Sequence, residues 1–121
     1  LAADERGVTS LMICVSEGCH EIIEWLLELK DGAFAKDLVY AKDDEDLTAF
    51  TKALIAGDLE AAELVLSAFG DDKEKQLEYI TQKDREGITP LEFATDHNLD
   101  FPEVVQEIEA FIAEKIKELE Q

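Results

Sequence analysis

An eight-residue pattern that recurs three times constrains this chain more than its composition does. Each copy contains Asp, two polar residues, a turn residue, an aliphatic residue, Thr, a small residue or proline, and a large apolar residue. The copies begin at Asp4, Asp43 and Asp84 of the 121-residue sequence. A short unit that cannot bury its own apolar face must stack on its neighbours. The sequence therefore predicts a stack of similar units.

The chemistry of the pattern predicts a tight turn that leads into a helix. Gly7 and Gly87 occupy the turn position, where a positive φ is needed, and Asp46 stands there in the second copy. The Thr hydroxyl can accept a hydrogen bond from a free N–H of the first helical turn. This capping residue is present in every copy, as Thr9, Thr48 and Thr89.

Each pattern is followed by a short helix and then by a longer one with an apolar stripe at helical spacing. The short helices are expected at residues 10–17, 49–56 and 90–97, and they end at Gly18, Gly57 and Asn98. The longer helices are expected at residues 20–29, 59–69 and 102–119. The connectors, residues 30–37 and 70–78, are expected to be insertions or extra helical turns that pack against the domain.

These features resemble the ankyrin repeat family. The closest copy runs from Asp84 to Ala94 as Asp-Arg-Glu-Gly-Ile-Thr-Pro-Leu-Glu-Phe-Ala, and Gly18, Ile22 and Leu27 match the second half of a repeat. The Thr residues lie 39 and 41 residues apart, whereas the family period is about 33. The resemblance implies an all-α, ankyrin-type solenoid of about three repeats with a long C-terminal helix.

We expect residues 1–121 to form one domain, with repeats at about 4–42, 43–83 and 84–121. Leu1 begins within what looks like a motif, so we expect this to be a fragment of a longer chain. Two core layers are expected, one from Leu11, Phe50 and Leu91 and one from Leu26, Val65 and Ile108. Trp25 is expected to pack in the core or between repeats. At the uncapped start, we expect open space beside Leu11, Ile13 and Ile22.

The charge of the chain excludes several classes of partner. Thirty acidic and eleven basic residues give a formal net charge of −19, which argues against nucleic acid and anionic membrane surfaces. Two interpretations remain open: a solvated acidic surface, or attraction of a basic partner. No apolar run approaches the ~20 residues that span a bilayer. Two cysteines without a disulfide or metal pattern favour a soluble, intracellular protein.

The sequence contains no motif that predicts catalysis, and we expect no metal and no cofactor. The acidic run from Asp43 to Asp46 lacks the alternating ligands of a calcium loop. His20 and His97 are expected at the surface or at an interface. A non-enzymatic role is therefore predicted.

The resemblance implies that a partner protein binds the turns and the exposed side of the short helices. The partner is expected to have a basic or mixed surface. An alternative is a scaffold subunit held permanently in a larger complex, and a third is a small ligand-binding or enzymatic domain. The predicted contact residues are Glu5, Arg6, Val8, Ser16, Glu17, Asp44, Glu45, Leu47, Ile55, Arg85, Glu86, Ile88, Asp96 and His97.

Overall fold

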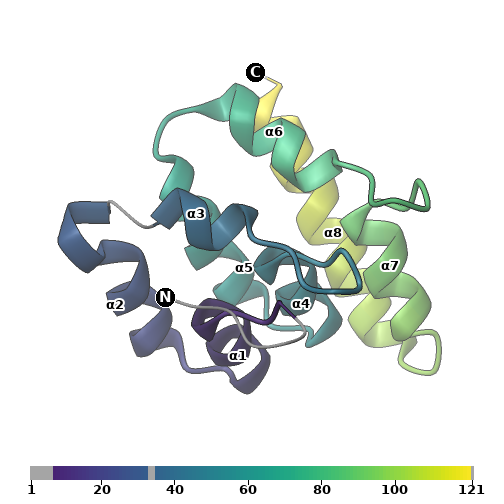
Figure 1. Ribbon diagram of the computed structural model, residues 1–121. Coiled ribbons are helices and arrows are strands. Elements are labelled where there is room, and N and C mark those ends of the chain that lie inside the picture. The colour runs from purple at the N-terminus through teal and green to yellow at the C-terminus, as the bar shows by residue number, and fades with distance from the viewer. Residues whose placement is uncertain (1–6, 33–34, 121) are drawn as a thin grey trace.

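The protein is described by a computed structural model that covers residues 7–32 and 35–120 (Figure 1). Within these ranges every regular element is helical, which confirms the all-α prediction. The elements are α1 (Ser10–Glu17), α2 (His20–Gly32), α3 (Ala35–Tyr40), α4 (Ala49–Ile55), α5 (Leu59–Leu66), the 3-10 helix η1 (Ser67–Phe69), α6 (Lys73–Thr81), α7 (Pro90–His97) and α8 (Pro102–Leu119).

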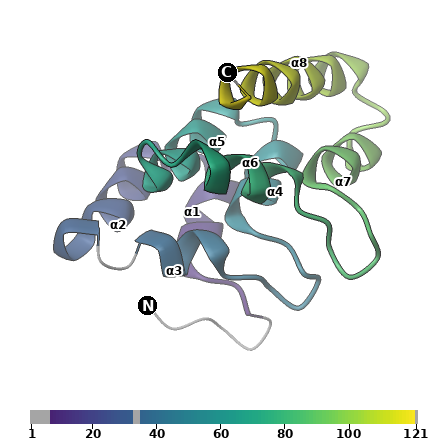
Figure 2. The ribbon, with the colours of Figure 1, turned by 90° about the horizontal axis from the view of Figure 1, so that it is seen from above.

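The helices form a row of stacked hairpins. The short helices form one layer, in which α1 packs on α4 and α4 packs on α7, and α2 packs on α5 in a second layer. Figure 2 shows α2 at one end of the row and α7 and α8 at the other. The long helix α8 contacts α7 and α6, and Lys115 reaches Glu63 on α5 at 2.7 Å. The predicted solenoid with a long C-terminal helix is therefore confirmed.

The turn and capping residues adopt the predicted geometry. Gly7, Asp46 and Gly87 have φ values of 77°, 67° and 79°. The hydroxyl oxygens of the capping threonines accept hydrogen bonds from backbone N–H groups three residues later. These bonds are 3.3 Å long from Met12 to Thr9, 3.4 Å from Thr51 to Thr48, and 3.2 Å from Glu92 to Thr89.

The short helices end in two different ways. Gly18 and Gly57 have φ values of 73° and 70°, so the left-handed stop is confirmed there. Asn98 instead has a φ of −113°. Its side-chain amide donates to the carbonyl oxygens of Ala94 at 2.9 Å and Ile55 at 3.1 Å. The amide thus satisfies a carbonyl of its own last turn directly and ties α7 to α4.

The two long connectors form additional helices, α3 and α6. The residues that pack down from them are Leu38 and Val39 on α3, and Tyr79 and Ile80 on α6, each at most 3% exposed. The Tyr79 hydroxyl donates to the carbonyl oxygen of Val39 at 2.6 Å. Burial raises the pKa of this phenol, so the proton stays available for the bond. Phe34, an apolar residue of the first connector, lies outside the described residues.

The predicted core layers are confirmed with one correction. Leu26, Val65 and Ile108 are all buried, and so are Leu11 and Phe50. Leu91 is only half-buried. The difference follows from position, because within the described residues α7 has a neighbouring short helix, α4, on one side only.

The start of the stack differs from the prediction at two residues, Trp25 and Leu11. Trp25 was expected to pack inside, but its side chain is 61% exposed. Ile13 and Ile22 are each 48% exposed, as expected for an uncovered end, whereas Leu11 is fully buried against the domain. Trp25 is exposed because α2 lies at the end of the row, with α1, α3 and α5 as its neighbours.

His20, at the start of α2, joins the first two repeats. Its ring nitrogen Nε2 lies 2.7 Å from Oδ2 of Asp58, and Nδ1 lies 3.0 Å from Oε2 of Glu60. Both ring nitrogens therefore face carboxylates, an arrangement that only the doubly protonated ring satisfies completely. The hydrogen bond to Asp58, helped by the nearby negative charges, raises the pKa of His20 above its ordinary value.

A candidate partner-binding face

Two turns that the structure describes in full form fingers that project from the short helices. The middle finger is residues 43–47 and the third finger is residues 84–88; of the equivalent first finger, residues 4–8, the structure describes residues 7 and 8 alone. We call the surface made by these fingers and the exposed side of α1, α4 and α7 the finger face. In Figure 2 the loops of the middle and third fingers extend from the same side of the molecule.

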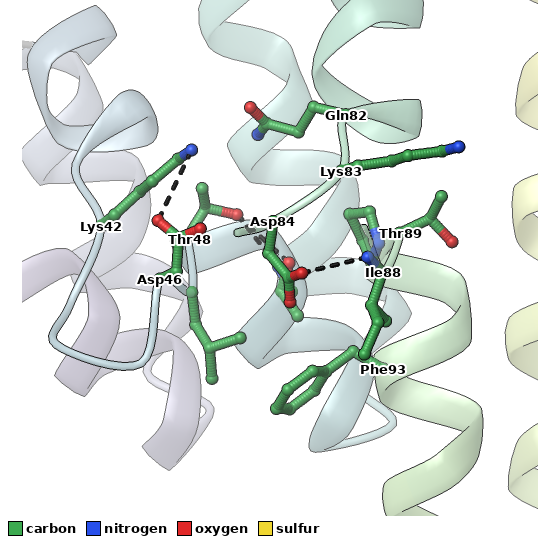
Figure 3. Close-up of a pocket in the computed structure, with 12 residues that line it drawn as sticks. Lys42, Asp46, Thr48, Gln82, Lys83, Asp84, Ile88, Thr89 and Phe93 are labelled. Atoms are coloured by element: carbon green, nitrogen blue, oxygen red, sulfur yellow. Dashed lines mark hydrogen bonds and ion pairs between the residues drawn. The ribbon is translucent and has the colours of Figure 1, made fainter. Parts of the chain in front are cut away.

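An aspartate organises each of the two fully described fingers. Oδ1 of Asp43 accepts hydrogen bonds from the N–H groups of Glu45 at 2.9 Å and Leu47 at 3.0 Å. Oδ1 of Asp84 makes the same pair of contacts, with the N–H of Glu86 at 2.8 Å and with the N–H of Ile88 at 3.0 Å. Figure 3 shows the contact with Ile88. The backbone therefore closes each of these two fingers around a carboxylate, which explains why the second and third patterns begin with Asp.

Lys52 neutralises the organising aspartate of the middle finger. Its ammonium lies 2.8 Å from Oδ2 of Asp43, and the Asp43 side chain is 3% exposed. Burial would raise the pKa of this carboxyl, but the hydrogen bonds from Lys52 and from the backbone of Leu47 and Glu45 outweigh burial and lower it. Asp43 and Lys52 therefore form an ion pair with each other. The exposed charges of the middle finger are Asp44 and Glu45.

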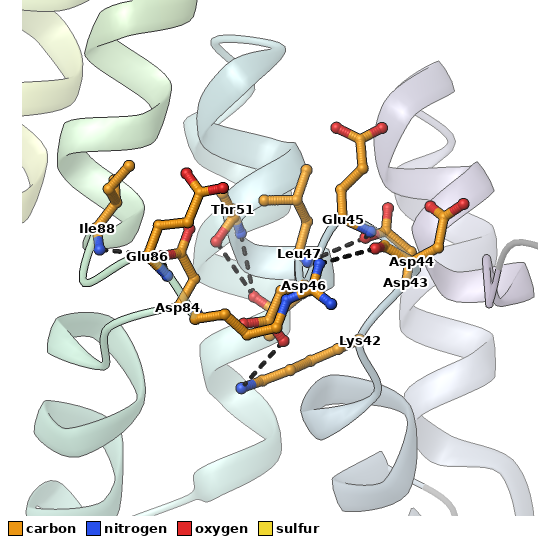
Figure 4. Close-up of polar contacts among 12 residues, drawn as sticks. Lys42, Asp43, Asp44, Glu45, Asp46, Leu47, Thr51, Asp84, Glu86 and Ile88 are labelled. Atoms are coloured by element: carbon orange, nitrogen blue, oxygen red, sulfur yellow. Dashed lines mark hydrogen bonds and ion pairs between the residues drawn. The ribbon is translucent and has the colours of Figure 1, made fainter.

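Direct hydrogen bonds hold the middle and third fingers in register (Figure 4). The backbone N–H of Arg85 donates to Oδ2 of Asp46 at 2.8 Å. The guanidinium of Arg85 donates to the carbonyl oxygen of Asp44 at 3.0 Å, and Lys42 lies 3.7 Å from Oδ1 of Asp46. These contacts give the two fingers a common, fixed geometry.

Two shallow hollows lie on either side of the middle finger. One, of about 290 Å³, is lined by Val8, Met12, Ile13, Ser16, Glu17, Asp43, Asp44, Glu45 and Lys52. The other, of about 230 Å³, is lined by Asp44, Glu45, Asp46, Asp84, Arg85, Glu86 and Phe93. The crevice between the fingers in Figure 3 has a volume of about 20 Å³, which suits a water molecule and not an organic ligand.

The structure places most of the predicted contact residues on the surface. Neither hollow is lined by Ile55, Asp96 or His97. Leu47 is a correction: its side chain is 6% exposed and packs inside, so only its backbone belongs to the finger. The exposed residues are Ser16, Glu17, Asp44, Glu45, Arg85, Glu86, Asp96 and His97. Val8, Ile55 and Ile88 are half-buried, and Glu5 and Arg6 lie outside the described residues.

The prediction missed one row of residues that line the hollows. Ile13, Lys52 and Phe93 each follow the capping Thr of their repeat by four positions, and each lines one of the two hollows. Their shared position in the repeat is the signal that could have identified them. The row contributes an aliphatic, a cationic and an aromatic side chain to the floor of the finger face.

Among the described residues, no three side chains of His, Cys, Asp or Glu are grouped to bind a metal ion. None of the described helices combines the length and the apolar character that crossing a membrane requires.

Comparison with known proteins agrees with this architecture. The chain is 32% identical over 115 residues to BTB/POZ domain-containing protein 1 of Schizosaccharomyces pombe, and the match covers 89% of this chain and 8% of that protein. Residues 11–109 match the family model for ankyrin repeats in three copies. With the fingers, caps and stacked hairpins described above, this match shows that the chain belongs to the ankyrin repeat family.

Proposed function

We propose that this chain is a non-enzymatic module that binds a partner protein along the finger face. The observation that carries the proposal is the pair of hollows separated by the middle finger. Asp44 and Glu45 are exposed and line both hollows. A partner segment that crosses the middle finger would therefore meet these two carboxylates from either side.

The charges around the hollows favour a basic or mixed segment. In the larger hollow Lys52 is neutralised by Asp43, which leaves Glu17, Asp44 and Glu45 as exposed acids. Ile13 and Phe93 supply apolar surface at the two ends. Such a surface fits a segment with one or two apolar side chains among lysines or arginines, because complementary charge guides association and apolar contacts hold the complex.

The family and the relative support a role within a larger protein. Ankyrin repeats generally mediate protein–protein interaction, and this chain matches 8% of the length of the fission yeast protein. We propose three repeats, at about 4–42, 43–83 and 84–121, in an intracellular, soluble setting. A scaffold subunit held permanently in an assembly is the second candidate, and the exposed Ile22 and Trp25 favour it.

Selection of peptides from a random display library on the immobilised chain tests the proposal. We expect enriched peptides to be rich in Lys or Arg. We also expect the D44K/E45K variant to slow their association at least about tenfold at low salt, since charges at the rim of an interface act mainly on association rate. Fluorescence anisotropy and stopped-flow mixing measure affinity and rate.

The matched control is E107K/E114K, which changes the net charge equally on the exposed surface of α8. This control should leave association within about twofold of the parent chain, because these charges lie on another element. Equal slowing by both variants would assign the effect to total charge and contradict a finger-face site. Enrichment of acidic or neutral peptides would contradict the proposed partner chemistry.

A further inference from the structure

The smaller hollow of the finger face combines an aromatic ring with several carboxylates. It has a volume of about 230 Å³ and lies between the middle and third fingers, where Phe93 and residues 44–46 and 84–86 line it. We call it the Phe93 hollow. Its walls come from the second and third repeats, which pack on each other through α4 and α7. The shape of this hollow is therefore set inside the stack and not at either end of it.

The side chain of Phe93 presents an aromatic ring to the hollow. It extends from α7 toward the second repeat (Figure 3). The ring of His97 stacks on it, with the two centroids 4.6 Å apart and an angle of 19° between the ring planes. This stacking holds the Phe93 ring in place. Because the face of an aromatic ring carries partial negative charge, the ring surface that remains open to the hollow can attract a cation.

Three carboxylates around the Phe93 hollow have no ion-pair partner within the described part of the chain. They belong to Asp44, Glu45 and Glu86, and all three residues are exposed. Asp46 and Asp84, which also line the hollow, are instead held by contacts of the fingers themselves. The hollow therefore has negative charge on the walls beside its aromatic ring.

Arg85 lines the same hollow without neutralising these carboxylates. Its guanidinium donates to the backbone carbonyl oxygen of Asp44 at 3.0 Å, and not to a carboxylate. This contact shows that a guanidinium group fits beside the middle finger. Five acidic residues and one arginine line the hollow, so a second cation would be attracted to it.

The larger hollow, on the other side of the middle finger, suits a different side chain. There Ile13 stands at the repeat position of Phe93, and the ammonium of Lys52 is also present. An aliphatic side chain offers no ring face to a cation, and a lysine repels one. The two hollows therefore favour an apolar side chain on one side of the middle finger and a cationic side chain on the other.

We propose that the Phe93 hollow binds an arginine side chain of the partner segment, an inference that rests on the proposed function of the finger face. The guanidinium lies on the ring of Phe93 and donates to the carboxylates of Glu45 and Glu86. Arginine suits this site better than lysine, because a planar guanidinium can stack on a ring while its N–H groups pair with carboxylates at its edge. A lysine ammonium is more strongly hydrated and has no plane to stack.

The geometry of the stack also sets the spacing of the two anchors in the partner. Neighbouring packed helices lie about 8–10 Å apart, and an extended segment advances about 3.3 Å per residue. The arginine in the Phe93 hollow and the apolar residue in the larger hollow are therefore about three residues apart in the partner segment.

Amides of single amino acids test the arginine site without the partner. N-acetyl-arginine amide is titrated into the ¹⁵N-labelled chain while backbone amide resonances are followed by NMR. We expect saturable shifts centred on Glu45, Glu86 and Phe93, with a Kd of about 1–10 mM. N-acetyl-lysine amide should bind at least about threefold more weakly. N-acetyl-citrulline amide, which has the shape of arginine without its charge, should not saturate.

Replacement of the ring tests the stacking contact. F93L keeps an apolar side chain but removes the aromatic face, so it should weaken binding of arginine amide about two- to fivefold, the loss expected for a cation–π contact at an exposed site. The matched control is F101L, at a phenylalanine that is 61% exposed on another segment. This control should leave the affinity unchanged.

A second pair of variants tests the carboxylates at positions where folding is not at risk. E45Q/E86Q changes two exposed residues of the fingers and should weaken binding of arginine amide about threefold or more. E103Q/E107Q removes the same charge from exposed positions of α8 and should leave the affinity within about 1.5-fold of the parent chain.

Three results would overturn the arginine site: lysine amide that binds as tightly as arginine amide, equal responses of F93L and F101L, or no saturation below about 50 mM. Each of them leaves the proposed function standing if library peptides still bind the parent chain and lose association rate in D44K/E45K. Saturable binding of arginine amide without any enriched peptide would support the arginine site and contradict the proposed function.

Discussion

Asp46 adopts an unfavourable backbone conformation that is stabilised by a hydrogen bond to its side chain. It stands where the first and third fingers have glycine, and its φ is 67°. A left-handed backbone costs a non-glycine residue about 1–2 kcal/mol. The carboxylate recovers stability because Oδ2 accepts the N–H of Arg85 in the next finger at 2.8 Å. Glycine would relieve the backbone but would leave the two fingers without this bond.

His20 makes the joint between the first two repeats dependent on pH. Below the ordinary His pKa of about 6.5, the ring is protonated in the folded and the unfolded chain, so its contribution to stability is complete. As the pH rises through the raised pKa of the folded state, the ring loses its proton and that contribution is lost. We therefore expect the free energy of unfolding to fall over this window.

Urea unfolding from about pH 5.5 to about pH 8.5 measures this effect, since the window brackets histidine titration. H20Q should flatten the dependence, whereas H97Q should retain it because His97 is exposed on another repeat. A parent chain that gains stability with rising pH over the same window would contradict the assigned role of His20.

At the scale of elements, the connectors are the main departure from a plain repeat. The sequence predicted that residues 30–37 and 70–78 pack down, but it did not identify α3 and α6 as separate helices. Their packing depends on each other and on the stack. Tyr40, Phe69 and Tyr79 form a cluster whose ring centroids lie 5.0 to 5.6 Å apart, and these rings come from α3, η1 and α6. No local pattern encodes a contact among three distant segments.

The Tyr79 hydroxyl provides the test of this joint. Y79F keeps the ring but leaves the carbonyl oxygen of Val39 without its donor, so we expect a loss of about 1–3 kcal/mol in the free energy of unfolding. Urea unfolding at neutral pH gives the value. The control is Y40F, at a residue that is 43% exposed, which should cost less than about 0.5 kcal/mol. Equal effects of the two variants would show that the hydrogen bond does not join α6 to α3.

At the scale of the molecule, the net charge of −19 opposes compaction. Acids repel one another most at low ionic strength, and the screening length falls from about 30 Å at 0.01 M salt to about 3 Å at 1 M. We expect the midpoint of urea unfolding to rise as NaCl increases over this range, because self-repulsion weakens faster than the few described ion pairs.

The matched variant for this measurement is E103Q/E107Q/E114Q, which has three fewer negative charges. It should be more stable than the parent chain at low salt and should show a smaller salt dependence. A midpoint that falls steadily with NaCl would mean that ion pairs such as Lys52–Asp43 and Lys115–Glu63 outweigh the repulsion.

The sequence by itself determined the local architecture of each repeat. Thr capping, positive φ at Gly7, Asp46 and Gly87, and the bounds of the short helices follow from residues close together in the chain, because these interactions close within a few positions. The finger residues were predicted from the family resemblance instead, and of these Asp44, Glu45, Arg85 and Glu86 are exposed. The sequence did not determine which apolar side chains another element would cover.

The tertiary structure decided those questions. Burial is a property of what packs against a side chain and not of the side chain alone. Leu47 lies inside its finger, Leu91 is half-covered, and Trp25 is exposed because α2 ends the row. The same reason applies to the hollows of the finger face, which form only where residues about forty positions apart are brought side by side by stacking.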